Sequence, residues 1–242
     1  MLMAGSRRRP RGIPALLAGA ALLLGADTAR GATFTVDATL NGNDITLDGV
    51  CDADSSTDTD CSLRAAVQEA NNTAAADTIS FKNGSVAGGD PDDVSFDPSS
   101  DPRLIDEPPP AITQPLTVDA GNCEADLDEP PKPCATVESG WVVNSPGGEV
   151  RISGLAFRGE GSGAELIAID VVAAGGSVPA LPDFMLTNSW FGLDRNGNEV
   201  DLPLLEQAVL LEDVTGARIG TGFLADRNVF ARQEIAVDVL GA

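Results

Sequence analysis

Short runs of alternating apolar and polar residues recur along most of this chain. Residues 32–36, Ala-Thr-Phe-Thr-Val, alternate as a half-buried strand does, and residues 77–81 repeat the pattern. Another strand is expected between Ile112 and Val118, where Pro115 limits its pairing. Turns rich in Gly, Asn, Asp and Pro separate such runs. The pattern therefore predicts a protein built mainly of short β-strands.

From Val137 onward, β-rich segments follow one another closely, and no helical period of useful length appears. The segments that begin at Gly154, Asn188 and Arg227 look like variants of one theme. A repeat of about 20–25 residues cannot bury its own inner face, so such repeats have to stack. The segments expected to form strands are Val150–Ile152, Leu155–Phe157, Leu166–Val171, Phe184–Leu186, Val209–Leu211, Ile219, Val229–Phe230 and Ile235–Val239.

Two features of these repeats leave alternatives open. Asn188 and Asn228 are expected to stack their side-chain amides at equivalent turns, although ordinary surface turns suit asparagine equally well. A β-sandwich is the alternative fold, but it needs hairpin turns between neighbouring strands. The irregular connections in this chain favour stacked repeats over a sandwich.

Residues 62–72 carry the helical signal of the chain. Leu63, Ala66, Val67 and Ala70 have the i, i+3, i+4, i+7 spacing of one apolar helix face. Ser62 precedes them and is a suitable N-cap. A short amphipathic helix is therefore predicted here, between two predicted strands.

The same stretch carries a family resemblance. Residues 61–71 read Cys-Ser-Leu-Arg-Ala-Ala-Val-Gln-Glu-Ala-Asn, which resembles the Cys-Ser-Leu-Arg-Glu-Ala module at the start of a family of secreted bacterial proteins. Position 65 is Ala where that family usually has Glu, so a capping-box contact with Ser62 is missing. The resemblance implies an all-β fold, a right-handed parallel β-helix whose open N-terminal end is covered by the helix. It implies an architecture and a compartment, and no activity.

This reading divides the chain into four parts. They are a signal peptide over 1–31, an N-terminal capping module over 32–82, Pro- and Asp-rich loops with one strand over 83–136, and β-helix coils over 137–242. The chain stops straight after a strand segment, so further coils are expected to follow in a longer protein.

The N-terminus has the pattern of a secretory signal peptide. Four arginines between Arg7 and Arg11 precede the apolar segment Ile13–Leu24, which is too short to span a bilayer. Small residues then suit cleavage before Ala32 or after Ala26. An uncleaved N-terminal anchor is the alternative. No later segment is long and apolar enough to cross a membrane, so a secreted or cell-surface location is expected.

Because exported proteins enter oxidising surroundings, the four cysteines are expected to form disulfides. Cys51 and Cys61 bracket one short loop, and Cys123 and Cys134 bracket another. Each bridge closes a loop of about ten residues and contributes roughly 2–3 kcal/mol on loop-entropy grounds. Four cysteines allow three pairings, and a metal site is the weaker alternative because the chain has no His.

The charge balance is strongly acidic. The chain carries a formal net charge of −22 at pH 7. Without residues 1–31, ten basic and thirty-six acidic residues remain, a net charge of −26. Such a charge argues against nucleic acid and anionic membrane surfaces as partners. A solvated acidic surface suited to salt is the simplest interpretation, and cation binding is the other.

Calcium has two candidate sites in the sequence. Asp52, Asp54, Asp58 and Asp60 lie in the loop between two cysteines, and Ca²⁺ favours clustered carboxylates. This loop lacks the Gly and Glu spacing of a helix-loop-helix calcium site. The segment from Asp194 through Asn196 and Asn198 to Asp201 is the second candidate, and a tight Asn-Gly turn explains it better.

Catalysis has little support in the composition. The absence of His and Tyr excludes a Ser-His-Asp triad and His-ligated metals. Asp170, Asp213 and Asp238 follow strand segments, so they are weak candidates for glycoside hydrolysis by paired carboxylates. With Ca²⁺ and an arginine they would instead suit a pectate-lyase-like reaction; the candidates are Arg151, Arg158 and Arg218. Chance placement of three surface acids explains them better, because no compact motif sets such a pair.

The function expected from sequence is therefore binding rather than catalysis. A β-helix offers a flat strand face, which suits an extracellular structural, adhesive or glycan-binding module that contacts glycans or a surface protein. Trp141, Trp190 and Phe191 are the candidates for stacking on sugars, with core packing favoured for Phe191. A polysaccharide lyase or glycoside hydrolase of the pectate-lyase-like type is the alternative.

Overall fold

Three parallel β-sheets make up most of the computed structural model. It describes residues 30–38, 42–53, 60–82, 104–105, 108–121, 133, 135–138, 140–144, 148–159, 167–172, 184–193, 197, 205–214, 216–223 and 226–241. The fold is all-β with one helix within these ranges. The predicted signal peptide lies almost wholly outside the described residues.

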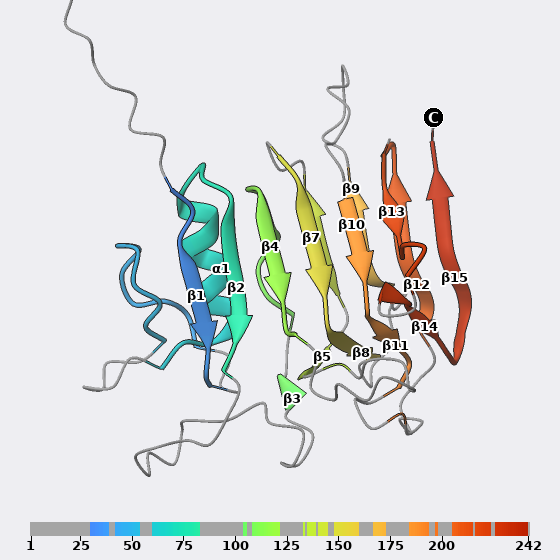
Figure 1. Cartoon of the computed structure of the whole chain (residues 1–242), viewed down its shortest axis with the longest axis horizontal. Coiled ribbons are helices and arrows are strands. Elements are labelled where there is room, and N and C mark those ends of the chain that lie inside the picture. Colours follow the sequence, from blue (N-terminus) through green and yellow to red (C-terminus); the bar gives the residue numbers. More distant parts are fainter. Residues whose placement is uncertain are drawn as a thin grey trace, which may run out of the picture.

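The strands of each sheet come from successive parts of the chain (Figure 1). The six-stranded sheet contains β1 (Thr33–Val36), β2 (Asp77–Phe81), β4 (Leu116–Asp119), β7 (Val150–Ser153), β10 (Phe184–Thr187) and β13 (Arg218–Ile219). The five-stranded sheet contains β3 (Leu104–Ile105), β5 (Ala135–Glu138), β8 (Leu155–Arg158), β11 (Trp190–Phe191) and β14 (Val229–Phe230). The four-stranded sheet contains β6 (Trp141–Asn144), β9 (Ile167–Val172), β12 (Leu205–Glu212) and β15 (Gln233–Leu240).

The chain visits the three sheets in a fixed rotation. From β4 it passes to β5 and β6, then to β7, β8 and β9, and the same order repeats to β15. Each strand pairs in parallel with its counterpart in the next round. Every pair among the described strands is parallel, so the hairpin-based sandwich considered from sequence is wrong.

The core lies between the sheets and consists of columns of like residues. In one column Phe157, Phe191 and Phe230 stack with ring centroids 5.0 and 5.1 Å apart, close to the spacing of paired strands. Trp141 meets Phe157 edge-on at 5.4 Å. Such ring pairs stabilise the core beyond what the burial of their apolar area contributes.

The repeated theme predicted from sequence is confirmed, and the amide stack is wrong. Trp190 pairs with Ala156 on one side and with Val229 on the other, so the three segments align from their first residues. This register puts Asn228 beside Ser189 rather than beside Asn188. The Asn228 side chain accepts from the Ser189 N–H (2.9 Å) and donates to the Leu186 carbonyl (2.9 Å), tying neighbouring rounds together.

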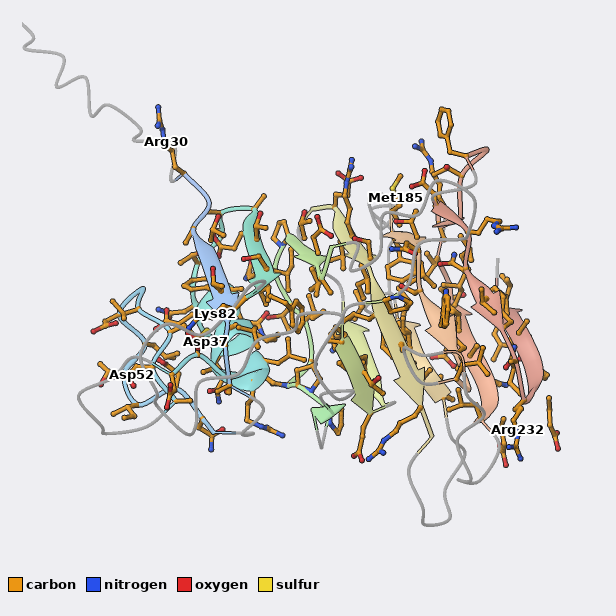
Figure 2. All side chains as sticks on the ribbon, turned by 60° about the horizontal axis from the view of Figure 1, so that its bottom comes forward. Arg30, Asp37, Asp52, Lys82, Met185 and Arg232 are labelled. Carbon is orange, nitrogen blue, oxygen red and sulfur yellow. A yellow bond between two sulfur atoms is a disulfide. The ribbon has the colours of Figure 1, made fainter. Side chains whose placement is uncertain are left out.

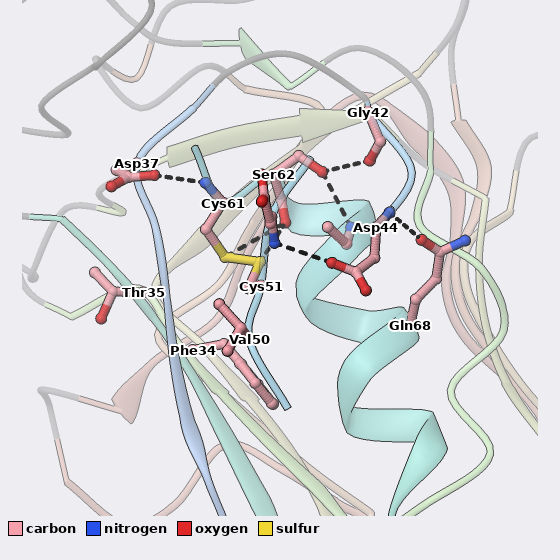
Figure 3. Close-up of a disulfide and its surroundings, with 12 residues drawn as sticks. Phe34, Thr35, Asp37, Gly42, Asp44, Val50, Cys51, Cys61, Ser62 and Gln68 are labelled. Atoms are coloured by element: carbon pink, nitrogen blue, oxygen red, sulfur yellow. Dashed lines mark hydrogen bonds between the residues drawn. A yellow bond between two sulfur atoms is a disulfide. The ribbon is translucent and has the colours of Figure 1, made fainter. Parts of the chain in front are cut away.

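The predicted helix is confirmed as α1 (Leu63–Asn72), with Ser62 as its N-cap. The Ser62 hydroxyl accepts from the Ala65 N–H at 3.0 Å and donates to the Gly42 carbonyl at 2.6 Å (Figure 3). In the chain, α1 stands between two strands of the six-stranded sheet, where later rounds have strands of the other two sheets. Its apolar stripe is buried, as Val67 is fully enclosed.

Asn71 on α1 completes the edge of the four-stranded sheet. Ile112 forms a parallel bridge to Val143 of that sheet. Its N–H donates to the Val142 carbonyl, and its carbonyl accepts from the Asn144 N–H. On the other side, the Asn71 amide donates to the Ala111 carbonyl and accepts from the Thr113 N–H, each at 2.8 Å. The side chain therefore satisfies backbone groups that an open edge would leave unpaired. The strand predicted from Ile112 begins only at Leu116, after Pro115.

A disulfide joins Cys51 to Cys61, as predicted, with a Cα–Cα distance of 5.1 Å (Figure 3). The loop before it is fastened to α1 by Glu69, whose carboxylate accepts from the N–H groups of Asp48 (2.9 Å) and Gly49 (3.0 Å). Burial raises the pKa of the Glu69 carboxyl; these donors oppose the rise, and the neighbouring Asp44 reinforces it. Cys123 and Cys134 lie outside the described residues, so their pairing stays a prediction.

Candidate functional site

The outer faces of the three sheets differ in how much they expose. On the five-stranded sheet, the outward residues Thr136, Ala156 and Trp190 are all buried. On the four-stranded sheet, Leu210 is only 6% exposed although it alternates with core residues. The six-stranded sheet, in contrast, has outward side chains that reach solvent along its whole length. This sheet therefore offers the accessible flat face of the molecule.

Two columns of outward side chains line that face, and seven of their eleven members are Thr or Ser, so we call it the hydroxyl face. The strand register places their members side by side from β1 to β13. The first column is Thr33, Thr78, Thr117, Arg151, Met185 and Arg218, and the second is Thr35, Ser80, Asp119, Ser153 and Thr187. Figure 2 shows the side chains on the ribbon, with Met185 labelled.

The geometry of the sheet sets the spacing of these groups. Neighbouring strands lie about 4.8 Å apart, and alternate residues of one strand lie about 6.7 Å apart. The hydroxyls also bond to one another across strands: Thr35 Oγ1 and Ser80 Oγ are 3.1 Å apart, and Ser153 Oγ donates to an Asp119 carboxylate oxygen at 2.9 Å. The face is therefore a regular and rigid grid of hydrogen-bonding groups.

Charges on the hydroxyl face are few and nearly balanced. Arg151 forms an ion pair with Glu149 at 2.8 Å, and both side chains remain substantially exposed. Arg218 and Asp119 are exposed as well. An exposed pair contributes little to stability, but it keeps the Arg151 guanidinium over the sheet. Against a chain charge of −22, this face is locally close to neutral.

The groups of this face suit hydrogen bonding to a ligand. Hydroxyls both donate and accept hydrogen bonds, and the Asp119 carboxylate among them accepts from the Ser153 hydroxyl. A rigid array loses little side-chain freedom when a ligand binds, which favours affinity. The arrangement suits an extended ligand that is itself rich in hydroxyls.

The candidate catalytic acids fall on the four-stranded sheet and are only partly brought together. Asp170 and Asp238 occupy the same register position on either side of Leu210. Asp213 lies beyond the end of β12, in a left-handed turn with φ of 55°, where it is close to Gly241. Burial first, and the charge of Glu212 second, raise the pKa of the Asp170 carboxyl.

The arginines that a lyase would need are elsewhere. Arg151 and Arg218 belong to the six-stranded sheet, whereas Arg158 pairs with Glu138 at 3.1 Å on the five-stranded sheet. Asp238 instead accepts from the Gln207 side chain at 3.2 Å. The carboxylates and arginines named from sequence therefore do not form one group.

The structure describes only some of the residues named as calcium candidates. Asp52 and Asp60 flank the disulfide loop, while Asp54 and Asp58 lie outside the described residues, as do the acidic and amide residues from Asp194 to Asp201. No group of three or more Asp, Glu, Cys or His side chains suited to a metal occurs within the described ranges. Both calcium sites therefore stay predictions.

The tryptophans do not form a sugar-stacking surface. Trp141 is fully buried and Trp190 is 6% exposed, so both candidates from sequence are wrong. Trp190 points outward, but Gly197 lies against its indole ring. A Cβ atom at position 197 would be only 3.5 Å from that ring. Phe191 is in the core, as favoured from sequence.

Comparison with known proteins gives no further guide. No protein-family model, curated protein or solved structure matches this chain. Helices of the length and hydrophobicity needed to cross a bilayer are lacking among the residues that the structure describes.

Proposed function

We propose that this chain is a secreted, right-handed parallel β-helix whose hydroxyl face binds an extended extracellular polysaccharide. The rotation of the chain through three parallel sheets supports the fold, because stacked coils pair each strand with the next round. The signal-like N-terminus and the Cys51–Cys61 bridge support export. The protein acts as a structural, adhesive or glycan-binding module at or near a cell surface.

The observation that carries this proposal is the pair of hydroxyl columns. A polysaccharide repeats its hydroxyls along one direction, as the sheet does along its stack of strands. Each contact is weak, and a long chain sums many of them. The strong negative charge of the protein disfavours polyanions, so an uncharged polysaccharide is the expected ligand.

Replacing Thr78 and Thr117 together by Val removes two hydroxyls from the centre of the face and keeps the side-chain shape. Because each net hydrogen bond is worth about 0.5–1.5 kcal/mol, affinity for a soluble neutral glucan should fall about tenfold or more. Isothermal titration calorimetry measures this loss, with a polyuronate as the charged comparison ligand.

The matched control is Thr221→Val, which lies outside the hydroxyl face in the loop after β13. It should leave glucan affinity unchanged. Equal affinity of the double variant and the parent chain, or tighter binding of the polyuronate than of the glucan, would refute the proposal.

Polysaccharide cleavage is the alternative function, and the shared register of Asp170 and Asp238 is the observation in its favour. Two strand steps separate their backbones by about 9.6 Å, and the buried Leu210 occupies the position between them. Both carboxylates are only partly exposed, and the arginines named from sequence lie on the other two sheets, so we expect neutral and acidic polysaccharides to stay intact with or without Ca²⁺. New reducing ends or unsaturated products, lost on Asp170→Asn, would establish an enzyme instead.

A further inference from the structure

The loop 42–52, which leads into the disulfide, is held against α1 by a carboxyl group that is fully buried. Glu69 of α1 has no exposed surface, and its two oxygens accept from the N–H groups of Asp48 (2.9 Å) and Gly49 (3.0 Å). A carboxylate removed from water is costly unless its charge is compensated. Two backbone N–H groups compensate it in part, so the protonation state of Glu69 matters for the loop.

A second carboxyl group lies beside the first. The Asp44 side chain is within hydrogen-bonding reach of Glu69, and its charge acts on Glu69 as well. Asp44 is itself fixed in position. Its N–H donates to the Gln68 side chain at 2.7 Å (Figure 3), and its Oδ1 atom accepts from the Asp52 N–H at 2.9 Å. Two carboxyl groups are therefore brought together between the loop and the helix.

One oxygen of this pair has no hydrogen-bond donor. The Oδ2 atom of Asp44 is buried, and none of the residues that the structure describes donates to it. A buried acceptor without a donor is costly. A proton on Glu69 supplies the missing donor, because an O–H group there donates to Asp44 while the remaining lone pairs of Glu69 still accept from the loop.

The other charged groups around α1 have partners of their own. Asp77 on β2 accepts from a threonine hydroxyl (2.7 Å) and from a backbone N–H (2.6 Å). Asp37, just after β1, accepts from a backbone N–H at 2.8 Å, and β1 itself has no ionisable side chain. Arg64 on the helix donates to a backbone carbonyl at 3.1 Å. Burial first, and then Asp44, raise the pKa of the Glu69 carboxyl against the opposing effect of the two loop N–H groups.

We propose that a proton shared between Glu69 and Asp44 fastens the loop 42–52 to α1, so that the loop is held at acid pH and loosens as the pH rises. A glutamate whose pKa is raised in the closed loop favours closure below its ordinary pKa of about 4.3, and this contribution is lost as the pH rises through the raised pKa. Above that pH, two negative charges repel each other across the contact. The disulfide keeps the end of the loop attached in both states. None of these residues belongs to the hydroxyl face, so the device is separate from glycan binding.

Hydrogen exchange of the Asp48 and Gly49 amides, measured by NMR and corrected for the intrinsic effect of pH, tests the shared proton. Their protection should fall between about pH 4 and about pH 8, tenfold for each tenfold difference in Glu69 acidity between the open and the closed loop. In Asp44→Asn a side-chain amide can donate in place of the proton, so protection should stay high across this range. Asp48→Asn is the matched control. Its carboxylate is exposed and accepts from the Val50 N–H, so this variant loses one loop charge and should keep the fall.

Other results would overturn the shared proton, provided that circular dichroism shows both variants folded like the parent chain. Constant protection of the two amides in the parent chain would show that no proton controls the loop. Protection that rises with pH would show that the charged Glu69 carboxylate holds the loop through its N–H bonds alone. A fall that persists in Asp44→Asn, or that disappears in Asp48→Asn, would assign the effect to the overall charge of the loop.

Discussion

Replacing Val67 by Asp should lower the free energy of unfolding by about 3–5 kcal/mol, the usual cost of an uncompensated buried charge. Val67 is fully buried on the face of α1 that covers the first strands. Val67 belongs to a cluster of buried apolar side chains, which offer no charge to compensate the new carboxylate. Urea unfolding followed by circular dichroism measures the loss.

Asn72→Asp is the matched control, since Asn72 is exposed at the end of the same helix. A charge there meets water and only the weak unfavourable field of a helix C-terminus, so the cost should stay below about 1 kcal/mol. Equal effects of the two substitutions would mean that α1 does not close the N-terminal end of the core.

Phe191→Ala should cost about 3–5 kcal/mol, as expected when a buried aromatic ring is removed. The ring is fully buried and stacks between Phe157 and Phe230. Its loss leaves a cavity in the middle of the aromatic column, where neighbouring rounds are held at a fixed spacing by their backbone pairing. Chemical denaturation with two spectroscopic probes measures the change.

Phe230→Ala provides the comparison within the same column. Phe230 is only partly buried because no described strand pairs beyond β14, so its truncation should cost clearly less than that of Phe191. A smaller loss of unfolding free energy for Phe191→Ala than for Phe230→Ala would contradict the deeper burial of Phe191 in the aromatic column.

Much of the strand content could be predicted from sequence because alternation is a local signal. The segments around Val150, Phe184 and Val209 were all identifiable in this way, and the structure confirms them as strands. The helix was equally readable from its apolar period and from Ser62. The assignment of strands to three sheets could not be predicted from sequence, because it depends on the direction that the chain takes at each turn.

The strand at Trp141–Asn144 shows a second limit. Neither this strand nor β5 was among the segments expected from sequence. The two strands lie close together in the chain, on either side of Gly140, which has φ of 100°. Burial of outward residues was also beyond the sequence. Trp190 looks like a surface aromatic in a strand pattern, and only the folded structure, in which Gly197 lies against its ring, shows that it is 6% exposed.

The hydroxyl face was missed, although its signal was present. Thr33 and Thr35, Thr78 and Ser80, and Ser153 and Thr187 all occupy polar positions of alternating segments. They become a site only when the strand register aligns them, and register is a property of the folded stack. Of the acidic candidates, Asp170 and Asp238 are separated in the strand register by the buried Leu210.

The most direct measurement of the central claim is methyl NMR of threonine-labelled protein during titration with a neutral glucan. Five threonines lie on the hydroxyl face, namely Thr33, Thr35, Thr78, Thr117 and Thr187, and others, such as Thr73, Thr136 and Thr221, lie elsewhere. We expect shifts of the methyl signals confined to the five threonines of the face. Saturable shifts at Thr136 or Thr221 with none on the face would contradict glycan binding by the six-stranded sheet.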